Sequence, residues 1–95
     1  MTKSISVIIP VLNEAEKLSV SLHALQKYRN ACQLLVVDGG SNDGSPYIAM
    51  PLVDKVLLSP SGRAKQMNTG AANANTGILL FLHIDTQLPL SLIHI

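Results

Sequence analysis

The chain of 95 residues is poor in several residue types that mark specialised proteins. It has one cysteine and no tryptophan, and aromatic residues make up 3% of it. Since a single cysteine excludes an internal disulfide, we interpret Cys32 as a semi-buried structural thiol in a protein of the reducing cytoplasm. The formal net charge of +1 is too small to create the strong positive field that attracts nucleic acids, so no nucleic-acid partner is expected.

Long apolar runs are absent as well, because no stretch reaches the roughly 20 apolar residues that a membrane span needs. The apolar run 5–12 contains Ser6 and Pro10 and has no small-residue cleavage site after it. We therefore interpret it as a strand and not as a signal peptide. Peripheral membrane association of a longer parent protein stays open. The composition, 47% hydrophobic and 14% charged, is that of one small globular domain.

Apolar runs rich in branched residues alternate with helical patterns. The runs are 5–9, 34–37, 56–58 and 78–82. The first, second and fourth are almost continuously apolar, which predicts strands buried on both faces. This alternation predicts an α/β fold with a Rossmann-like parallel sheet and right-handed crossovers. The order stops after the fourth run, so we expect a truncated sheet whose domain continues in the parent protein.

Three helices are expected between these runs. The first opens at Asn13 or Glu14, the second is short and follows Ser45, and the third covers 63–75. The expected buried residues are Leu18, Leu22 and Leu25 of the first helix and Met67, Ala71 and Ala74 of the third. Gly70 and its alanine neighbours should let the third helix pack closely on the sheet.

A glycine-rich turn with a carboxylate follows the second apolar run. Asp38 is followed by Gly39 and Gly40, and Asp43 by Gly44. Glycine lets the backbone approach a ligand, and a carboxylate at the end of a parallel strand can accept hydrogen bonds from a base or ribose. For Asp38 we favour this binding role over a purely local turn role. For Asp43 we favour the local turn role.

A second polar signature, His83-Ile84-Asp85, follows the fourth run. In an extended segment the side chains of His83 and Asp85 point to the same side. A carboxylate there suits a hard cation, Mg²⁺ or Mn²⁺, shared with phosphate oxygens. We predict Asp85 as the metal ligand, whereas His83 either binds the metal or hydrogen-bonds a phosphate. Arg63, before the third helix, has the geometry to bind a diphosphate or a base edge.

Four segments of the chain resemble family 2 glycosyltransferases, which have the GT-A fold. These segments are 6–14, 36–45, 62–72 and 81–86. The resemblance covers residues 4 to about 89, and we expect 1–89 to be the amino-terminal, nucleotide-sugar-binding part of such a domain. The H-x-D form is similar to a subgroup of small bacterial members.

The resemblance implies a role for each matching residue. Pro10, Asn13 and Glu14 would border the nucleotide pocket, Asp38 would contact the nucleobase, and Arg63 would face the base or the diphosphate. His83 and Asp85 would stand in for the family's D-x-D, with a Mg²⁺ or Mn²⁺ ion on Asp85 bridging the donor diphosphate.

The chain departs from the family pattern in two places. Gly39 stands where many relatives carry a second Asp, and His83 replaces the first Asp of D-x-D. The general base of inverting members lies in the carboxyl-terminal half. The resemblance therefore implies no catalytic residue among these 95, and we expect the isolated polypeptide to be inactive.

The leading hypothesis is the donor-binding part of a glycosyltransferase that uses a nucleotide-diphospho-sugar, most often UDP-linked, and an acceptor that the sequence does not identify. A non-catalytic nucleotide-binding fragment is the alternative of another class. A nucleotidyltransferase is disfavoured, because the glycine-rich phosphate loop with its lysine is missing after the first strand.

The last six residues, 90–95, break the pattern of the preceding sequence. They are apolar without a partner element, and Leu-Ser-Leu-Ile-His-Ile is also a translation of the transposase end of a common sequencing adapter. We therefore expect this tail to be non-native. A short native helix or strand is the alternative.

Overall fold

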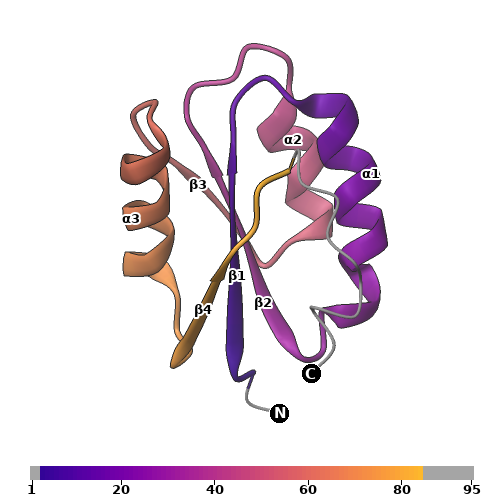
Figure 1. Ribbon diagram of the computed structural model, residues 1–95. Coiled ribbons are helices and arrows are strands. Elements are labelled where there is room, and N and C mark those ends of the chain that lie inside the picture. The colour runs from indigo at the N-terminus through magenta and orange to yellow at the C-terminus, as the bar shows by residue number, and fades with distance from the viewer. Residues whose placement is uncertain (1–2, 85–95) are drawn as a thin grey trace.

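The computed structural model describes residues 3–84 of the chain. The strands are β1 (Ile5–Val11), β2 (Cys32–Asp38), β3 (Lys55–Leu58) and β4 (Ile78–Phe81). The helices are α1 (Ala15–Leu25), α2 (Ser45–Ala49) and α3 (Arg63–Asn73), with 3-10 turns η1 (Gln26–Tyr28) and η2 (Met50–Leu52). Figure 1 shows one layer of strands with α1 and α2 on one face and α3 on the other. The expected α/β alternation is confirmed.

The four strands form one parallel sheet in the order β3-β2-β1-β4. β1 and β2 are the central strands, and their last residues, Val11 and Asp38, lie opposite each other. Because all strands run the same way, the loops after β1, β2, β3 and β4 emerge at one edge of the sheet. This edge, the upper one in Figure 1, is where ligands bind in open α/β sheets.

Alternate residues of the central strands supply two separate cores. The larger one lies under α1 and α2 and includes Leu18, Leu22 and Leu25 of α1, all buried as expected. The smaller one lies under α3 and is centred on Ile8 and Val37. Cys32 is fully buried in the larger core, deeper than the sequence suggested, and this burial raises the pKa of its thiol.

The expectation that the fourth apolar run is buried on both faces is wrong. Ile78, Leu79 and Phe81 of β4 are exposed, and the strand ends at Phe81. The physical reason is position: within residues 3–84, β4 pairs only with β1 and lies at the edge of the sheet, while α3 covers the central strands. An apolar run predicts a strand, but the neighbours of that strand decide which faces are covered.

Helix α3 also differs from its sequence pattern. Its two buried residues are Gln66 and Gly70, whereas the predicted Met67, Ala71 and Ala74 are only half-buried, and the helix ends at Asn73 and not at 75. A Cβ atom on Gly70 would lie 2.4 Å from Cγ2 of Ile8, so the expected close packing on the sheet is confirmed. Within the described range 3–84, no helix is long and apolar enough to cross a bilayer.

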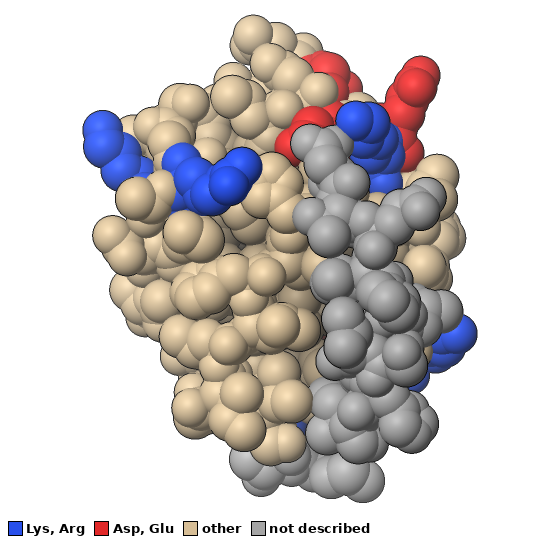
Figure 2. All heavy atoms as spheres, in the orientation of Figure 1, with Lys and Arg blue, Asp and Glu red and all other residues tan. Residues whose placement is uncertain are grey.

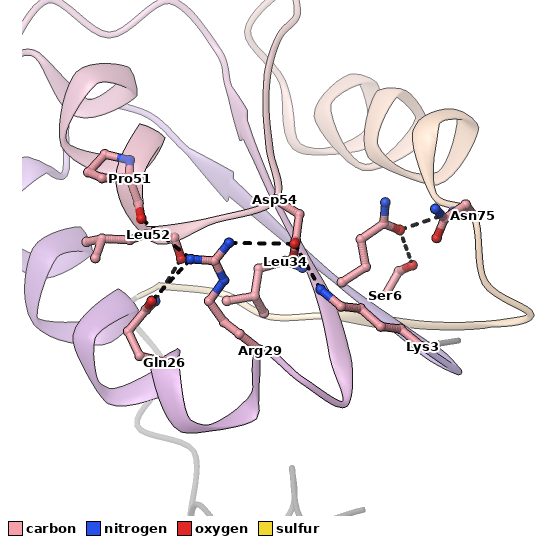
Figure 3. Close-up of polar contacts among 10 residues, drawn as sticks. Lys3, Ser6, Gln26, Arg29, Leu34, Pro51, Leu52, Asp54 and Asn75 are labelled. Carbon is pink, nitrogen blue, oxygen red and sulfur yellow. Dashed lines mark hydrogen bonds and ion pairs between the residues drawn. The ribbon is translucent and has the colours of Figure 1, made fainter. Parts of the chain in front are cut away.

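Side-chain hydrogen bonds fasten the opposite edge of the sheet, where the strands begin (Figure 3). The Asp54 carboxylate accepts a hydrogen bond from the Leu34 N–H at 2.6 Å and pairs with Lys3 at 2.9 Å and Arg29 at 3.6 Å. Nearby, the Gln26 amide donates to the carbonyls of Leu22 at 2.8 Å and Leu52 at 2.7 Å. These contacts hold the scaffold and lie far from the loops at the carboxyl ends of the strands.

Candidate functional site

The turn after β2 is organised around the Asp38 carboxylate. One oxygen, Oδ2, accepts hydrogen bonds from the N–H groups of Gly40 at 3.0 Å and Ser41 at 2.8 Å. The other, Oδ1, accepts a hydrogen bond from the Ser41 hydroxyl. Gly40 has a φ of 105°, which a residue with a side chain rarely adopts. Asp38 is 2% exposed, so its carboxylate is a fixed part of this turn.

The loop after β1 is tied directly to this turn. The Asn13 N–H donates to the Ser41 hydroxyl oxygen at 2.8 Å, and the Asn13 side-chain oxygen accepts from the Asn42 N–H at 2.7 Å. Asn13 has a φ of 50°, a conformation that asparagine tolerates better than most residues. The two predicted site residues Asn13 and Asp38 are therefore brought together through Ser41.

Asp43 has the local turn role that the sequence predicted, through its contacts with Ser45, and it also contacts the start of α1, 28 residues away in the chain. Its carboxylate accepts hydrogen bonds from the Ala15 N–H at 3.0 Å and from the N–H and hydroxyl of Ser45. The Ser45 hydroxyl, followed by the Ala15 N–H, holds the pKa of the Asp43 carboxyl below its ordinary value. The beginnings of α1 and α2 are thereby held together beside the candidate site.

Pro10 and Glu14 flank Asn13 on either side of the loop. Pro10 is buried in β1, and Glu14 is the half-buried residue immediately before α1. The β3–α3 loop reaches the site through the Ser59 N–H, which donates to the Asp38 carbonyl at 2.9 Å. Arg63 follows this loop as the exposed first residue of α3. In Figure 2, acidic side chains gather at this end of the molecule, and basic side chains flank them.

The second polar signature begins just beyond β4. Leu82 and Ile84 are buried in the larger core, whereas His83 between them is half-buried, so burial alternates along these three residues. The Leu82 N–H donates to the Ile8 carbonyl at 2.9 Å, which extends the pairing with β1 toward Pro10. The predicted metal ligand Asp85 lies outside the described residues.

Across residues 3–84, no three His, Cys, Asp or Glu side chains come together as a metal site. Hydrogen bonds from three donors already engage the two oxygens of Asp38, which leaves about one lone-pair position for any ligand. Mg²⁺ commonly uses one or two carboxylates together with substrate phosphates. A divalent cation at this edge therefore does not require a cluster of three protein ligands.

Two residues at the site were missed in the sequence. Ser41 joins Asp38 to Asn13, and its position three residues after an aspartate in a glycine-rich turn is a signal for such a contact. Gln66 is 5% exposed and donates to backbone carbonyls at the ends of β1 and β2. A glutamine four residues before a buried glycine on the same helix face is only a weak signal for this role.

The chain is similar in sequence to two glycosyltransferases. It is 37% identical over 91 residues to glycosyltransferase AglE of Haloferax volcanii, a match that covers 85% of this chain and 30% of that protein. It is 32% identical over 95 residues to 4,4'-diaponeurosporenoate glycosyltransferase of Staphylococcus haemolyticus, covering 92% of this chain and 25% of that protein. The chain therefore spans less than a third of the length of these relatives.

The fold is similar to that of solved glycosyltransferase structures, two of which illustrate the match. Glucosyl-3-phosphoglycerate synthase of Mycobacterium tuberculosis, in complex with Mn²⁺, UDP and glucosyl-3-phosphoglycerate, superposes with a TM-score of 0.79 at 21% identity, over 92% of this chain and 35% of the synthase. The mannosyltransferase PcManGT of Pyrobaculum calidifontis, in complex with GDP-mannose and Mn²⁺, gives 0.72 at 25% identity, over 94% and 29%. The family model of glycosyl transferase family 2 matches residues 6–94, and the chain belongs to this family.

Proposed function

We propose that this chain forms the donor-binding part of a glycosyltransferase that takes a sugar from a nucleoside diphosphate sugar, with a uridine nucleotide as the first candidate. The observation that carries the proposal is the network joining Asp38, Ser41 and Asn13 at the carboxyl ends of β1 and β2. Support comes from the structural neighbours that contain UDP or GDP-mannose.

The proposed contacts follow from the geometry of the turn. A carboxylate has about four lone-pair positions, and hydrogen bonds to Gly40 and Ser41 engage three of those of Asp38. The remaining position on Oδ1 is assigned to an N–H of the nucleobase. Pro10, Asn13 and Glu14 would border the nucleotide on the β1 side. The exposed Arg63 supplies positive charge for the base edge or the diphosphate.

A divalent cation, Mg²⁺ or Mn²⁺, belongs to the same proposal. Structural neighbours were solved with Mn²⁺ or Mg²⁺ together with UDP. In this chain Asp85 would hold the ion, and His83 would bind it or a donor phosphate. When bound, such an ion offsets the negative charge on the departing nucleoside diphosphate. The chain's own contribution is to fix the nucleotide so that the sugar faces the acceptor.

The nucleotide assignment is tested by isothermal titration of UDP onto Asp38→Asn. Asparagine retains an oxygen for the N–H groups of Gly40 and Ser41, but it changes the acceptor offered to the base. We expect UDP binding to weaken about tenfold, the cost of one lost hydrogen bond to a charged group. The melting temperature should also fall, because the side-chain nitrogen replaces the oxygen that accepts from the Ser41 hydroxyl. Glu16→Gln, which removes an exposed charge from α1, serves as the control. Unchanged UDP affinity in Asp38→Asn would contradict the base contact.

The metal assignment is tested by titrating UDP with Mn²⁺, with Mg²⁺ and with EDTA. We expect EDTA to weaken UDP binding in the unaltered protein and to have little further effect in Asp85→Asn. His83→Ala distinguishes the two options for His83. If His83 binds the metal, the variant should bind Mn²⁺ more weakly even in the absence of nucleotide. Equal UDP binding with and without EDTA would remove the cation from the proposal.

Transfer itself is proposed for the longer protein. The chain spans 30% of the length of the first relative and 25% of the second. We therefore expect the 95-residue polypeptide to bind the donor but to transfer no sugar to an acceptor. A radiolabelled donor assay that compares it with a longer form tests this.

We also propose a cytoplasmic location, in line with the buried, unpaired thiol of Cys32, which cell fractionation would test.

A further inference from the structure

Gln66 joins α3 to the two central strands at the edge that carries the candidate site. Its side-chain nitrogen Nε2 donates to the carbonyl of Val11 at 3.0 Å and to the carbonyl of Val37 at 2.9 Å. Val11 is the last residue of β1, and Val37 precedes Asp38 in β2. One amide group therefore fixes the ends of the strands that carry Asn13 and Asp38 toward the site.

Because Gly39 has no side chain, the Gln66 amide has room beside it. A Cβ atom at position 39 would lie 2.9 Å from Cδ and Oε1 of Gln66 and 3.1 Å from Nε2. Such contacts are too short, so a side chain at 39 would push the Gln66 amide away from the two carbonyls. The backbone alone does not demand glycine here, since the glycines with positive φ are Gly40, Gly44 and Gly62.

The Gly39 N–H extends the same connection. It donates to the Val11 carbonyl at 2.9 Å, the same oxygen that accepts from Gln66. The residue next to Asp38 is thus held from two directions, by the end of β1 and by the amide above it. Any displacement of Gln66 would be transmitted to the turn in which Asp38 accepts hydrogen bonds from Gly40 and Ser41.

We propose that Gln66 is a positioning residue for the nucleotide site. It sets the place of the Asp38 carboxylate by clamping the ends of β1 and β2, and it does so only with glycine at position 39. This inference rests on the proposed nucleotide binding for its affinity readout, but its structural readout is independent of any nucleotide.

The chain offers a matched control in Gln26. Like Gln66, it donates from Nε2 to two backbone carbonyls, here those of Leu22 and Leu52, but at the opposite edge of the sheet (Figure 3). We expect Gln66→Ala to weaken UDP binding about tenfold, and Gln26→Ala to leave it within about twofold, although both lower the melting temperature. Equal UDP affinity in the two variants would overturn the proposal.

The coupling between positions 39 and 66 is tested with Gly39→Ala, alone and combined with Gln66→Ala. We expect Gly39→Ala to weaken UDP binding several-fold when Gln66 is present. In the Gln66→Ala background the same substitution should have little further effect. Additive losses in the double variant would show that the two positions act separately and would refute the requirement for glycine.

An amide NMR spectrum of the nucleotide-free 95-residue chain separates this inference from the proposed function. Gln66→Met keeps the bulk of the side chain and removes its donors, so it serves if the alanine variant unfolds. We expect it to shift the amide resonances of Gly40 and Ser41, which Gln26→Ala should leave in place. Unchanged resonances of Gly40 and Ser41 in Gln66→Met would refute the positioning role. A failure of the unaltered protein to bind UDP would refute only the proposed uridine nucleotide.

Discussion

The side-chain oxygen of Asn13 accepts a hydrogen bond from the backbone N–H of Asn42 at 2.7 Å, which fastens the loop after β1 to the turn after β2. The two loops come from adjacent central strands, so this bond joins the β1 side of the candidate site to the β2 side. Both the side chain and the backbone of Asn13 are needed for the contact, since its φ of 50° turns the loop toward Asn42.

Replacing Asn13 separates these two contributions. Asn13→Gly keeps the positive φ and loses the hydrogen bond, so we expect a loss of about 1 kcal/mol in the free energy of unfolding. Asn13→Ala also places a side chain with no compensating hydrogen bond at positive φ, which should cost about 1 kcal/mol more. Urea unfolding of the two variants measures the difference. Equal stability of the glycine and alanine variants would show that the backbone conformation contributes nothing.

Gly70→Ala should destabilise the protein, although alanine favours helices. The new methyl group would lie 2.4 Å from Cγ2 of Ile8 and 3.2 Å from Cγ2 of Val37, so α3 must move off the sheet. Overpacking of this kind costs about 1–3 kcal/mol and helix propensity returns about 1 kcal/mol, so we expect a net loss of up to about 2 kcal/mol in the free energy of unfolding.

Gly77→Ala is the matched control for this prediction, because nothing lies within 4 Å of a Cβ atom at position 77. Its stability should stay within about 0.5 kcal/mol of the unaltered protein in thermal or urea unfolding. Similar effects of the two glycine substitutions would argue against close packing of α3 as the cause.

The acid sensitivity of the fold should depend on Asp54. Burial acts to raise the pKa of this carboxyl, but the Leu34 N–H and the charges of Lys3 and Arg29 outweigh it, and the pKa is lowered. A carboxyl with a lowered pKa stabilises the folded state above its unfolded-state pKa of about 3.9, and this stabilisation is lost as the pH falls through the folded-state value.

We therefore expect Asp54→Asn to be less stable than the unaltered protein at pH 7 and to show a flatter loss of stability below about pH 4. Urea midpoints measured from pH 2 to pH 7 test this, with Glu16→Gln as the control for removal of an exposed carboxylate. Parallel pH profiles for Asp54→Asn and the unaltered protein would contradict a stabilising role for the Asp54 ion pairs.

The sequence alone determined the features that depend on local pattern. A continuous apolar run before Asp38 predicted a buried strand that delivers this residue to the ligand-binding edge, and β2 does end at Asp38. The spacing of Leu18, Leu22 and Leu25 predicted the buried face of α1. Such periodicities arise from the backbone geometry of each element, so they can be seen before the elements are assembled.

Only the tertiary structure decided which faces are covered and which polar groups meet. The apolar strand β4 is largely exposed because it lies at the edge of the sheet, and this position depends on the topology of the whole sheet. Gln66 was overlooked because its acceptors, Val11 and Val37, lie 55 and 29 residues away in the chain. A polar side chain on a helix is normally expected in solvent, and only the meeting of α3 with the ends of β1 and β2 gives this amide its partners.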